Sequence, residues 1–138
     1  MYDPMMVAPM RDELVQAGVR SLATPDEVDG VLTDAGKTAL VVVNSVCGCA
    51  AANARPGVRL ALNHGTQPDH VVTVFAGVDR EATDRARSYF KGYMPSSPSI
   101  ALLKDGEVAF ILQRHEIEGR SPEDISSKLT GAFDEHCG

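Results

Sequence analysis

The chain has 138 residues, of which 43% are hydrophobic and 23% charged, a composition typical of a single globular domain with one core. Its formal net charge is -6 and it carries no cluster of lysine and arginine, which argues against nucleic acid and membrane as partners. The first residues lack the segments of a secretory signal, and the longest apolar run, residues 39–43, is too short to span a bilayer. These features predict one cytoplasmic domain over residues 1–138.

Two helices are expected before the first strand. Apolar residues at helical spacing predict a helix over residues 4–17, an N-terminal extension of the domain. Thr24, followed by proline and, three residues on, by Glu27, has the pattern of a capping box and predicts a second helix that ends near Gly36.

Residues 39–43 form a continuous run rich in valine, which predicts a central strand buried on both faces of a sheet. The elements expected after it are a helix, a strand, a helix, two strands and a helix, over residues 50–62, 71–76, 80–91, 99–103, 107–112 and from 122 onward. Pro56 should kink the first of these helices, and Asp79 should cap the second. Residues 104–106 carry a hairpin signal, Lys-Asp-Gly.

This order of elements predicts an α/β fold. Parallel strands joined by helices, followed by an antiparallel hairpin and a closing helix, form a mixed central sheet with helices on both faces. About four strands are expected.

The three cysteines of the chain are Cys47, Cys49 and Cys137. An odd number, with two cysteines one residue apart, makes a poor disulfide framework. In a reducing cytosol such a pair is more typical of catalysis, redox sensing or metal binding than of structural cross-linking.

Cys47 follows the predicted central strand by three residues and opens the next helix. Free N–H groups and the positive end of the dipole at a helix start stabilise a thiolate, and a lowered pKa makes the thiol more reactive at neutral pH. This placement predicts that Cys47 is the nucleophile of a redox site. Cys49 is then a resolving or modulating thiol.

The spacing of the pair bears on the kind of exchange. Side chains two residues apart on a helix point to different sides, so a Cys47–Cys49 disulfide should require local unwinding, for which Gly48 is suited. A strained disulfide is easily reduced. The pair is therefore expected to favour mixed-disulfide exchange or isomerisation over reduction of stable protein disulfides.

Two other interpretations of the pair remain open. Buried cysteines can serve simply as small hydrophobic residues. Alternatively, the pair could bind zinc or an iron–sulfur cluster in a non-enzymatic carrier, with a further ligand drawn from His64, His115, His136 or Cys137.

The chain resembles the bacilliredoxins, a thioredoxin-like family of bacteria. The stretches that carry the resemblance are residues 7–11, 40–51, 54–56, 72–77, 95–99, 114–119 and 132–137, which read VAPMR, LVVVNSVCGCAA, ARP, VTVFAG, PSSPS, RHEIEG and AFDEHC. They are spread along the chain, so the resemblance extends over nearly its whole length.

The resemblance implies a thioredoxin-like fold and removal of the small thiol bacillithiol from S-bacillithiolated client proteins. Cys47 would attack the mixed disulfide, release the client and keep the small thiol, which a second bacillithiol or a resolving cysteine would then remove. Bacillithiol would be a co-substrate, with no tightly bound cofactor and no metal. A protein disulfide isomerase of the same fold is the alternative within this chemistry.

The resemblance also implies a substrate-binding set. Pro98 would be the cis-proline beside the active sulfur, where backbone next to it, at Ser97, receives the substrate; otherwise it is an ordinary proline at the entry to a strand. Ser45 belongs to the same set. Arg55, and with it Arg114, is a candidate for binding carboxylates of the small thiol, the alternative being a salt bridge.

Cys137 is a candidate auxiliary thiol that would resolve Cys47 if the final helix docks near it. The alternative is an incidental thiol in a frayed tail.

Overall fold

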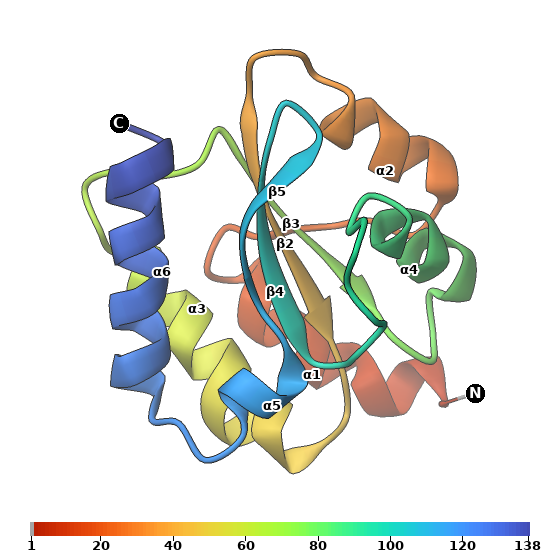
Figure 1. The fold of residues 1–138 in the computed structure, drawn as a ribbon. Helices are drawn as coiled ribbons and strands as arrows, with labels where there is room; N and C mark the ends of the chain where they lie inside the picture. Colours follow the sequence, from red (N-terminus) through yellow and green to blue (C-terminus); the bar gives the residue numbers. More distant parts are fainter. Residues whose placement is uncertain (1) are drawn as a thin grey trace.

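The computed structural model describes residues 2–138, which form an α/β structure around one mixed sheet (Figure 1). The strands are β1 (Arg20–Ser21), β2 (Thr38–Asn44), β3 (His70–Phe75), β4 (Ser99–Lys104) and β5 (Glu107–Leu112). The helices are α1 (Pro4–Val15), α2 (Pro25–Leu32), the π-helix η1 (Ala50–Ala54), α3 (Arg55–Ala61), α4 (Arg80–Arg87), α5 (Arg114–Ile117) and α6 (Pro122–His136).

The described residues form five strands in the order β1-β3-β2-β4-β5, one more than the sequence predicted. β1, β3 and β2 are parallel, whereas β4 is antiparallel to both β2 and β5. The additional strand, β1, has only two residues, which pair with Val72 and Thr73 of β3. So short a strand leaves no alternation of apolar and polar residues for a sequence pattern to detect.

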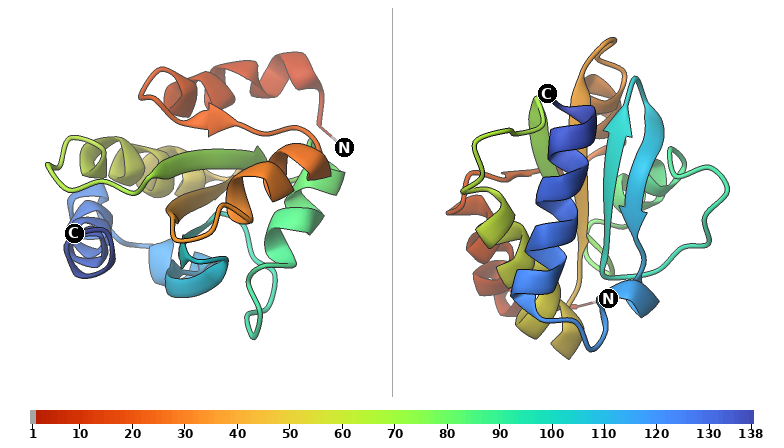
Figure 2. Two further views of the ribbon diagram at one scale, coloured as in Figure 1. Left: turned by 90° about the horizontal axis from the view of Figure 1, so that it is seen from above. Right: turned by 60° about the vertical axis from the view of Figure 1, so that its left-hand side comes forward.

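The central strand β2 is buried along its whole length, as its run of valines predicted. Leu40 and Val42 face a core formed with α3 and α6, while Val41 and Val43 face a second core formed with α2 and α4. Figure 2 shows these two helix pairs on opposite sides of the sheet. The N-terminal helix α1 adds Leu14 to the first core.

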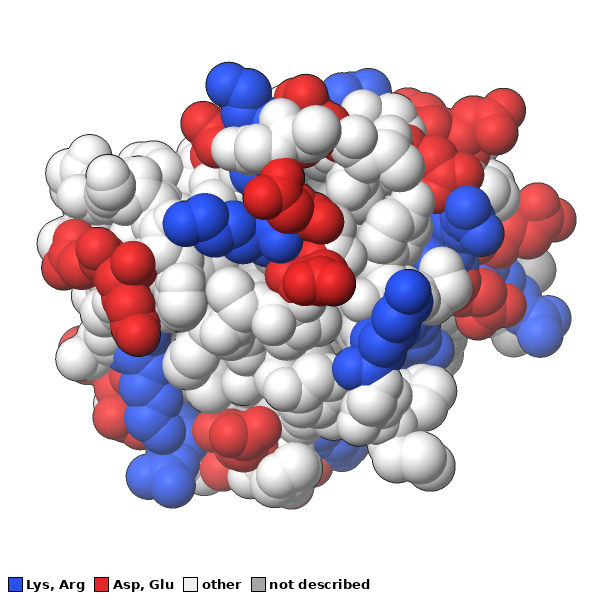
Figure 3. Space-filling model, turned by 45° about the horizontal axis from the view of Figure 1, so that its top comes forward, with Lys and Arg blue, Asp and Glu red and all other residues white. Residues whose placement is uncertain are grey.

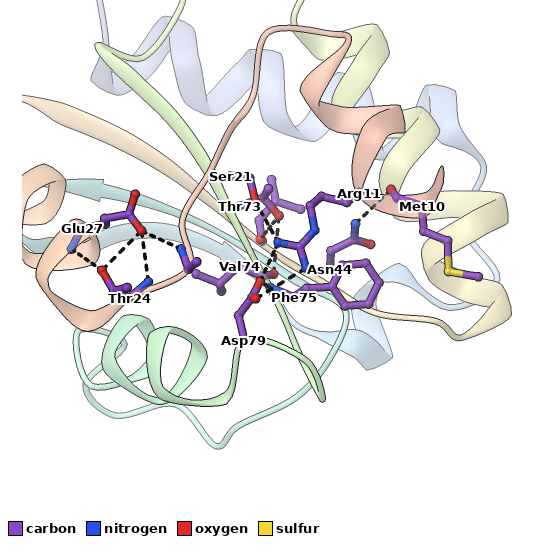
Figure 4. Close-up of polar contacts among 12 residues, drawn as sticks. Met10, Arg11, Ser21, Thr24, Glu27, Asn44, Thr73, Val74, Phe75 and Asp79 are labelled. Carbon is purple, nitrogen blue, oxygen red and sulfur yellow. Dashed lines mark hydrogen bonds and ion pairs between the residues drawn. The ribbon is translucent and has the colours of Figure 1, made fainter. Parts of the chain in front are cut away.

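The predicted cap of α2 is present in the structure, whereas the predicted cap of α4 is not. At α2 the Thr24 hydroxyl and the Glu27 carboxylate form the capping box, and the helix ends at Leu32, before Gly36 (Figure 4). Asp79 precedes α4, but its side chain makes no capping hydrogen bond. It instead accepts hydrogen bonds from the Arg11 guanidinium and the Phe75 N–H, which ties it to α1 and β3.

The segment after the cysteines begins as a π-helix rather than as a kinked α-helix. In η1 the Arg55 N–H donates to the Ala50 carbonyl, five residues back, and α3 follows with Pro56 in its first turn. Gly57 then allows close packing on α6, because a Cβ at this position would lie 2.6 Å from a side-chain methyl of Ile125. The change of helix type therefore precedes the proline.

The last third of the chain agrees well with its sequence pattern. The hairpin between β4 and β5 turns at Asp105 and Gly106, both with positive φ, as a type I′ turn requires. Helix α6 buries the four residues predicted to line its inner face, namely Ile125, Leu129, Ala132 and Phe133. The short helix α5 was not predicted, and α4 ends at Arg87 instead of residue 91.

Acidic and basic side chains alternate over the face shown in Figure 3, with neither sign forming a continuous patch there. Within residues 2–138, no helix has the length and apolar character that crossing a membrane requires.

Candidate functional site

Cys47 lies in a bend three residues beyond the carboxyl end of β2, and the helical segment begins immediately after it. Its carbonyl accepts hydrogen bonds from the N–H groups of Ala50 and Ala51, so Cys47 occupies the position that starts the first helical turn. Both Cys47 and Cys49 are half-buried, while Gly48 between them is exposed. The pair is thus accessible at one end of the sheet.

The two sulfurs lie 2.8 Å apart, in contact but not bonded. This corrects the expectation that the side chains point to different sides of a helix. Because Cys47 precedes the helical turn instead of lying within it, the helical spacing argument does not apply, and the two Cβ–Sγ bonds converge. Cys49 is therefore a nearby thiol for Cys47 without unwinding of a helix.

The surroundings of the two thiols shift their pKa values in opposite directions. Burial alone raises the pKa of Cys47, but hydrogen bonds to its sulfur from the Cys49 thiol, the Ser45 hydroxyl (3.2 Å) and the backbone N–H groups of Ala50 and Cys49 outweigh it and lower the pKa. Burial and the neighbouring Cys47 sulfur raise the pKa of Cys49. Cys47 is thus the thiol that ionises first, with Cys49 as its hydrogen-bond donor.

A buried arginine holds the loop that carries Cys47. The side chain of Arg55 is only 2% exposed, and its guanidinium donates to the Ser45 carbonyl (2.9 Å) and the Asn44 side-chain oxygen (3.0 Å). It also forms an ion pair with Glu13 of α1. The prediction that Arg55 binds substrate is therefore wrong, because its donors face the backbone beneath the site and not the solvent.

Helix α1 is fixed to this end of the sheet by further polar contacts, shown in Figure 4. The Asn44 side-chain amide donates to the Met10 carbonyl (3.3 Å). The Arg11 guanidinium lies over the Phe75 ring and donates to Asp79 (3.0 Å) and to Ser21. The N-terminal extension therefore supports the ends of β2 and β3 from which the site is built.

The Ser97–Pro98 peptide bond is cis, as expected of a proline in this loop. Pro98 is buried, and the Ser97 carbonyl accepts a hydrogen bond from Arg114 (3.2 Å). The assignment of these two residues to substrate binding stays a prediction.

A hollow of about 340 Å³ opens beside Cys47. Ser45, Cys47 and Ser97, all predicted site residues, lie in its wall. The other residues that line it are Tyr2, Val46, Ala76, Gly77, Arg87 and Arg114. A larger hollow, of about 700 Å³, lies between α1, α3 and the start of α6, away from the sulfurs.

Tyr2 and Arg87 line the hollow from outside every stretch that the sequence singled out. Tyr2 donates its N–H to the Gly77 carbonyl (3.3 Å), and its ring lies so close to Gly77 that a Cβ there would be 2.8 Å from a ring carbon. Arg87 reaches the hollow from α4. Both positions lie far along the chain from Cys47, and neither belongs to a motif, so no sequence signal marks them.

Cys137 does not join the pair. Burial raises the pKa of its thiol, which interacts with the Thr38 hydroxyl at the start of β2, whereas Cys47 lies beyond the far end of that strand. A strand of seven residues spans roughly 20 Å. Cys137 is therefore too distant to resolve Cys47 within this structure, which corrects the prediction of an auxiliary thiol.

The histidines proposed for a metal site are dispersed as well. His64 contacts Asp134 of α6 at 2.8 Å, and the side chain of His115 is 80% exposed. In the part of the chain that the structure describes, no three His, Cys, Asp or Glu side chains are grouped as a metal site would require. The arrangement gives no support to a metal or iron–sulfur carrier.

The hydrogen bond from Cys49 predicts how the reactivity of Cys47 depends on pH. The thiolate is the reacting form, so alkylation of Cys47 should accelerate as pH rises through its lowered pKa. Cys49→Ala removes the donor and should move the midpoint to higher pH. Cys49→Ser keeps a hydroxyl donor and should retain the low midpoint. The measurement is the rate of iodoacetamide alkylation against pH, followed by intact mass; equal midpoints for the two variants would contradict the assignment.

Comparisons with known proteins agree with this geometry. A family model described as "Disulphide isomerase" matches residues 2–137. A bacilliredoxin of Koribacter versatilis is 51% identical over 138 residues, covering 100% of this chain and 95% of that protein. A bacilliredoxin of Halalkalibacterium halodurans is 58% identical over 127 residues, covering 92% of this chain and 87% of its own length.

Among solved structures, the thioredoxin of Malassezia sympodialis superposes with a TM-score of 0.59 at 18% identity, over 87% of this chain and 91% of that one. The oxidised thioredoxin of Plasmodium falciparum gives a TM-score of 0.58 at 15% identity, over 87% and 99%. These likenesses show a thioredoxin-like fold. Together with the near full-length relatives and the paired thiols, they show that the chain belongs to the bacilliredoxin family of thiol–disulfide oxidoreductases.

Proposed function

We propose that this protein removes bacillithiol from S-bacillithiolated proteins of the cytoplasm by mixed-disulfide exchange at Cys47. The observation that carries the proposal is the pair of contacting sulfurs whose pKa values are shifted apart, in a chain with bacilliredoxin relatives. The client protein and the small thiol are the partners, and bacillithiol is a co-substrate in place of a bound cofactor.

In the first step the Cys47 thiolate attacks the bacillithiol sulfur of the mixed disulfide. The bond between the client sulfur and bacillithiol breaks as the Cys47–bacillithiol bond forms, and the client leaves as a thiolate that takes up a proton. No net electrons are exchanged with an outside reductant. A low pKa for Cys47 favours this step because the attacking group is already ionised at neutral pH.

In the second step the adduct on Cys47 is resolved. Cys49, whose sulfur is the nearest to Cys47, loses its proton, attacks Cys47 and expels the bacillithiol thiolate, which leaves a Cys47–Cys49 disulfide for an external thiol to reduce with two electrons. Alternatively, a second bacillithiol attacks the adduct, restores the Cys47 thiolate and leaves as bacillithiol disulfide. Ser45 and the loop at Ser97 and Pro98 would hold the substrate sulfur during both steps.

The matching family model is described as a disulphide isomerase, so protein disulfide isomerisation is the second candidate. The same Cys47 thiolate would then attack a disulfide between two protein sulfurs. The hollow beside Cys47 has a volume suited to a small molecule, which favours the small-thiol adduct over a bulky protein disulfide.

The test supplies the protein with a client that carries bacillithiol, and in parallel with a scrambled client that has only protein disulfides. Client release and the mass of the protein are followed over time. We expect rapid release and a transient adduct of one bacillithiol on Cys47. Comparable rates on both clients would favour the isomerase, and no transfer from the bacillithiolated client would refute the proposal.

A further inference from the structure

Two arginines reach the hollow beside Cys47 from different parts of the fold. Arg87 comes from α4, on one side of the sheet, and Arg114 is the first residue of α5, directly after β5. Both residues line the same hollow as Cys47. This brings two positive charges to the site in a chain whose formal net charge is -6.

Each guanidinium keeps hydrogen-bond donors to spare. Arg87 donates to the Ser96 carbonyl (3.2 Å), but its Nε–H is buried and has no partner among the described residues. Arg114 binds the Ser97 carbonyl through one terminal nitrogen and Glu118 through Nε. Because a guanidinium has five N–H donors, each residue keeps terminal N–H groups beyond these contacts.

Acidic groups around the pair compensate its charge only in part. Glu118 pairs with Arg114, and Asp84 is the acidic residue that acts on the charge of Arg87. Burial nevertheless lowers the pKa of Arg87, because a buried guanidinium is less well solvated than an exposed one. The charge of Asp84 offsets this loss only in part. An anionic ligand in the hollow would supply the opposite charge that this partly buried cation lacks.

We propose that Arg87 and Arg114 form a subsite that binds an anionic group, such as a carboxylate, on the small-thiol half of the mixed disulfide. Binding there would orient the small thiol so that its sulfur, and not that of the client, faces Cys47. A volume of about 340 Å³ is suited to a small molecule such as the thiol half of the mixed disulfide. The proposal rests on the proposed function, since it names what that exchange recognises.

The test uses three small symmetric disulfides of similar size, which carry two carboxylates, two hydroxyls or two ammonium groups. These are bis(carboxymethyl) disulfide, hydroxyethyl disulfide and cystamine. The rate at which each disulfide modifies Cys47 is measured by intact mass. It is divided by the rate at which the same disulfide reacts with a free thiol of low molecular weight, which corrects for the intrinsic reactivity of that disulfide. At low salt we expect a preference of roughly 10-fold for the dicarboxylate over the neutral compound, decreasing as salt rises.

The variants Arg87→Gln and Arg114→Gln should each reduce this preference, and the double variant should remove it. The rate with the neutral disulfide reports folding and thiolate reactivity, so a loss confined to the dicarboxylate isolates recognition of charge. Arg59→Gln, at an exposed position of α3, is the matched control and should leave the preference unchanged.

A preference near unity in the unmodified protein, or one that survives in the double variant, would overturn the subsite. These disulfides contain no bacillithiol and no client protein. A charge preference without removal of bacillithiol from clients would thus leave the subsite standing and refute the proposed function. Removal of bacillithiol by the double variant at the unmodified rate would count against the subsite alone.

Discussion

Replacing Cys47 by serine should abolish release of bacillithiol from a client, with a loss of at least about 1000-fold, as expected when the attacking group of a covalent mechanism is removed. A serine hydroxyl is not ionised at neutral pH, and the hydrogen bonds that lower the pKa of the Cys47 thiol do not make it a comparable nucleophile. The measurement is the rate at which the free client appears, together with the mass of the protein after the reaction.

Cys137→Ser is the matched control for this variant, because Cys137 is also half-buried but lies at the opposite end of β2. It should retain the full rate and should form the same adduct as the unmodified protein. Full activity in Cys47→Ser would contradict the mechanism. A loss in Cys137→Ser similar to that in Cys47→Ser would show that the distant thiol takes part.

Replacing Arg55 by methionine should lower the free energy of unfolding by about 2–4 kcal/mol, because it deprives the Ser45 carbonyl and the Asn44 side chain of a charged donor in a buried setting. For a chain of this size the melting temperature should fall by roughly 6–16 °C. Thermal and denaturant unfolding measure the effect. Activity should also fall, since the loop between β2 and Cys47 loses its anchor.

Arg59→Met, one turn later on the exposed side of α3, removes the same charge without removing a buried contact, and should change stability by less than about 0.5 kcal/mol. Glu13→Gln should have an intermediate effect, because Glu13 is partly exposed and a glutamine oxygen can still accept from Arg55. If Arg55→Met were as stable as Arg59→Met, the buried network would not be what holds the loop.

The sequence was sufficient for those parts of the molecule that local chemistry determines. The valine-rich run before the cysteines specified a strand buried on both faces, and Thr24 with Glu27 specified the start of α2. The Asp105–Gly106 turn and the inner face of α6 followed from residue types that leave few conformational choices. The candidate nucleophile also came from local order, as a cysteine placed between a strand and a helix.

Only the tertiary structure decided which residues share a site. Arg55 was expected to face a substrate, yet its guanidinium is buried against the end of β2 and paired with Glu13 of α1. Cys137 was expected near Cys47, but α6 runs along the sheet and ends beside the first residue of β2. Tyr2 and Arg87 lie far from Cys47 in the sequence, one before it and one after it. Both line the hollow through tertiary packing that no local pattern encodes.

The same division applies to the cysteine pair itself. The sequence by itself determined that two thiols lie one residue apart after a buried strand, which was enough to indicate redox chemistry. The relative position of the two thiols depended on where the first helical turn begins. Because Cys47 lies just before that turn in the structure, the two sulfurs are in contact. The side-chain contacts of Ser45 and Cys49 then set which thiol ionises, because a pKa depends on the groups around a sulfur in space.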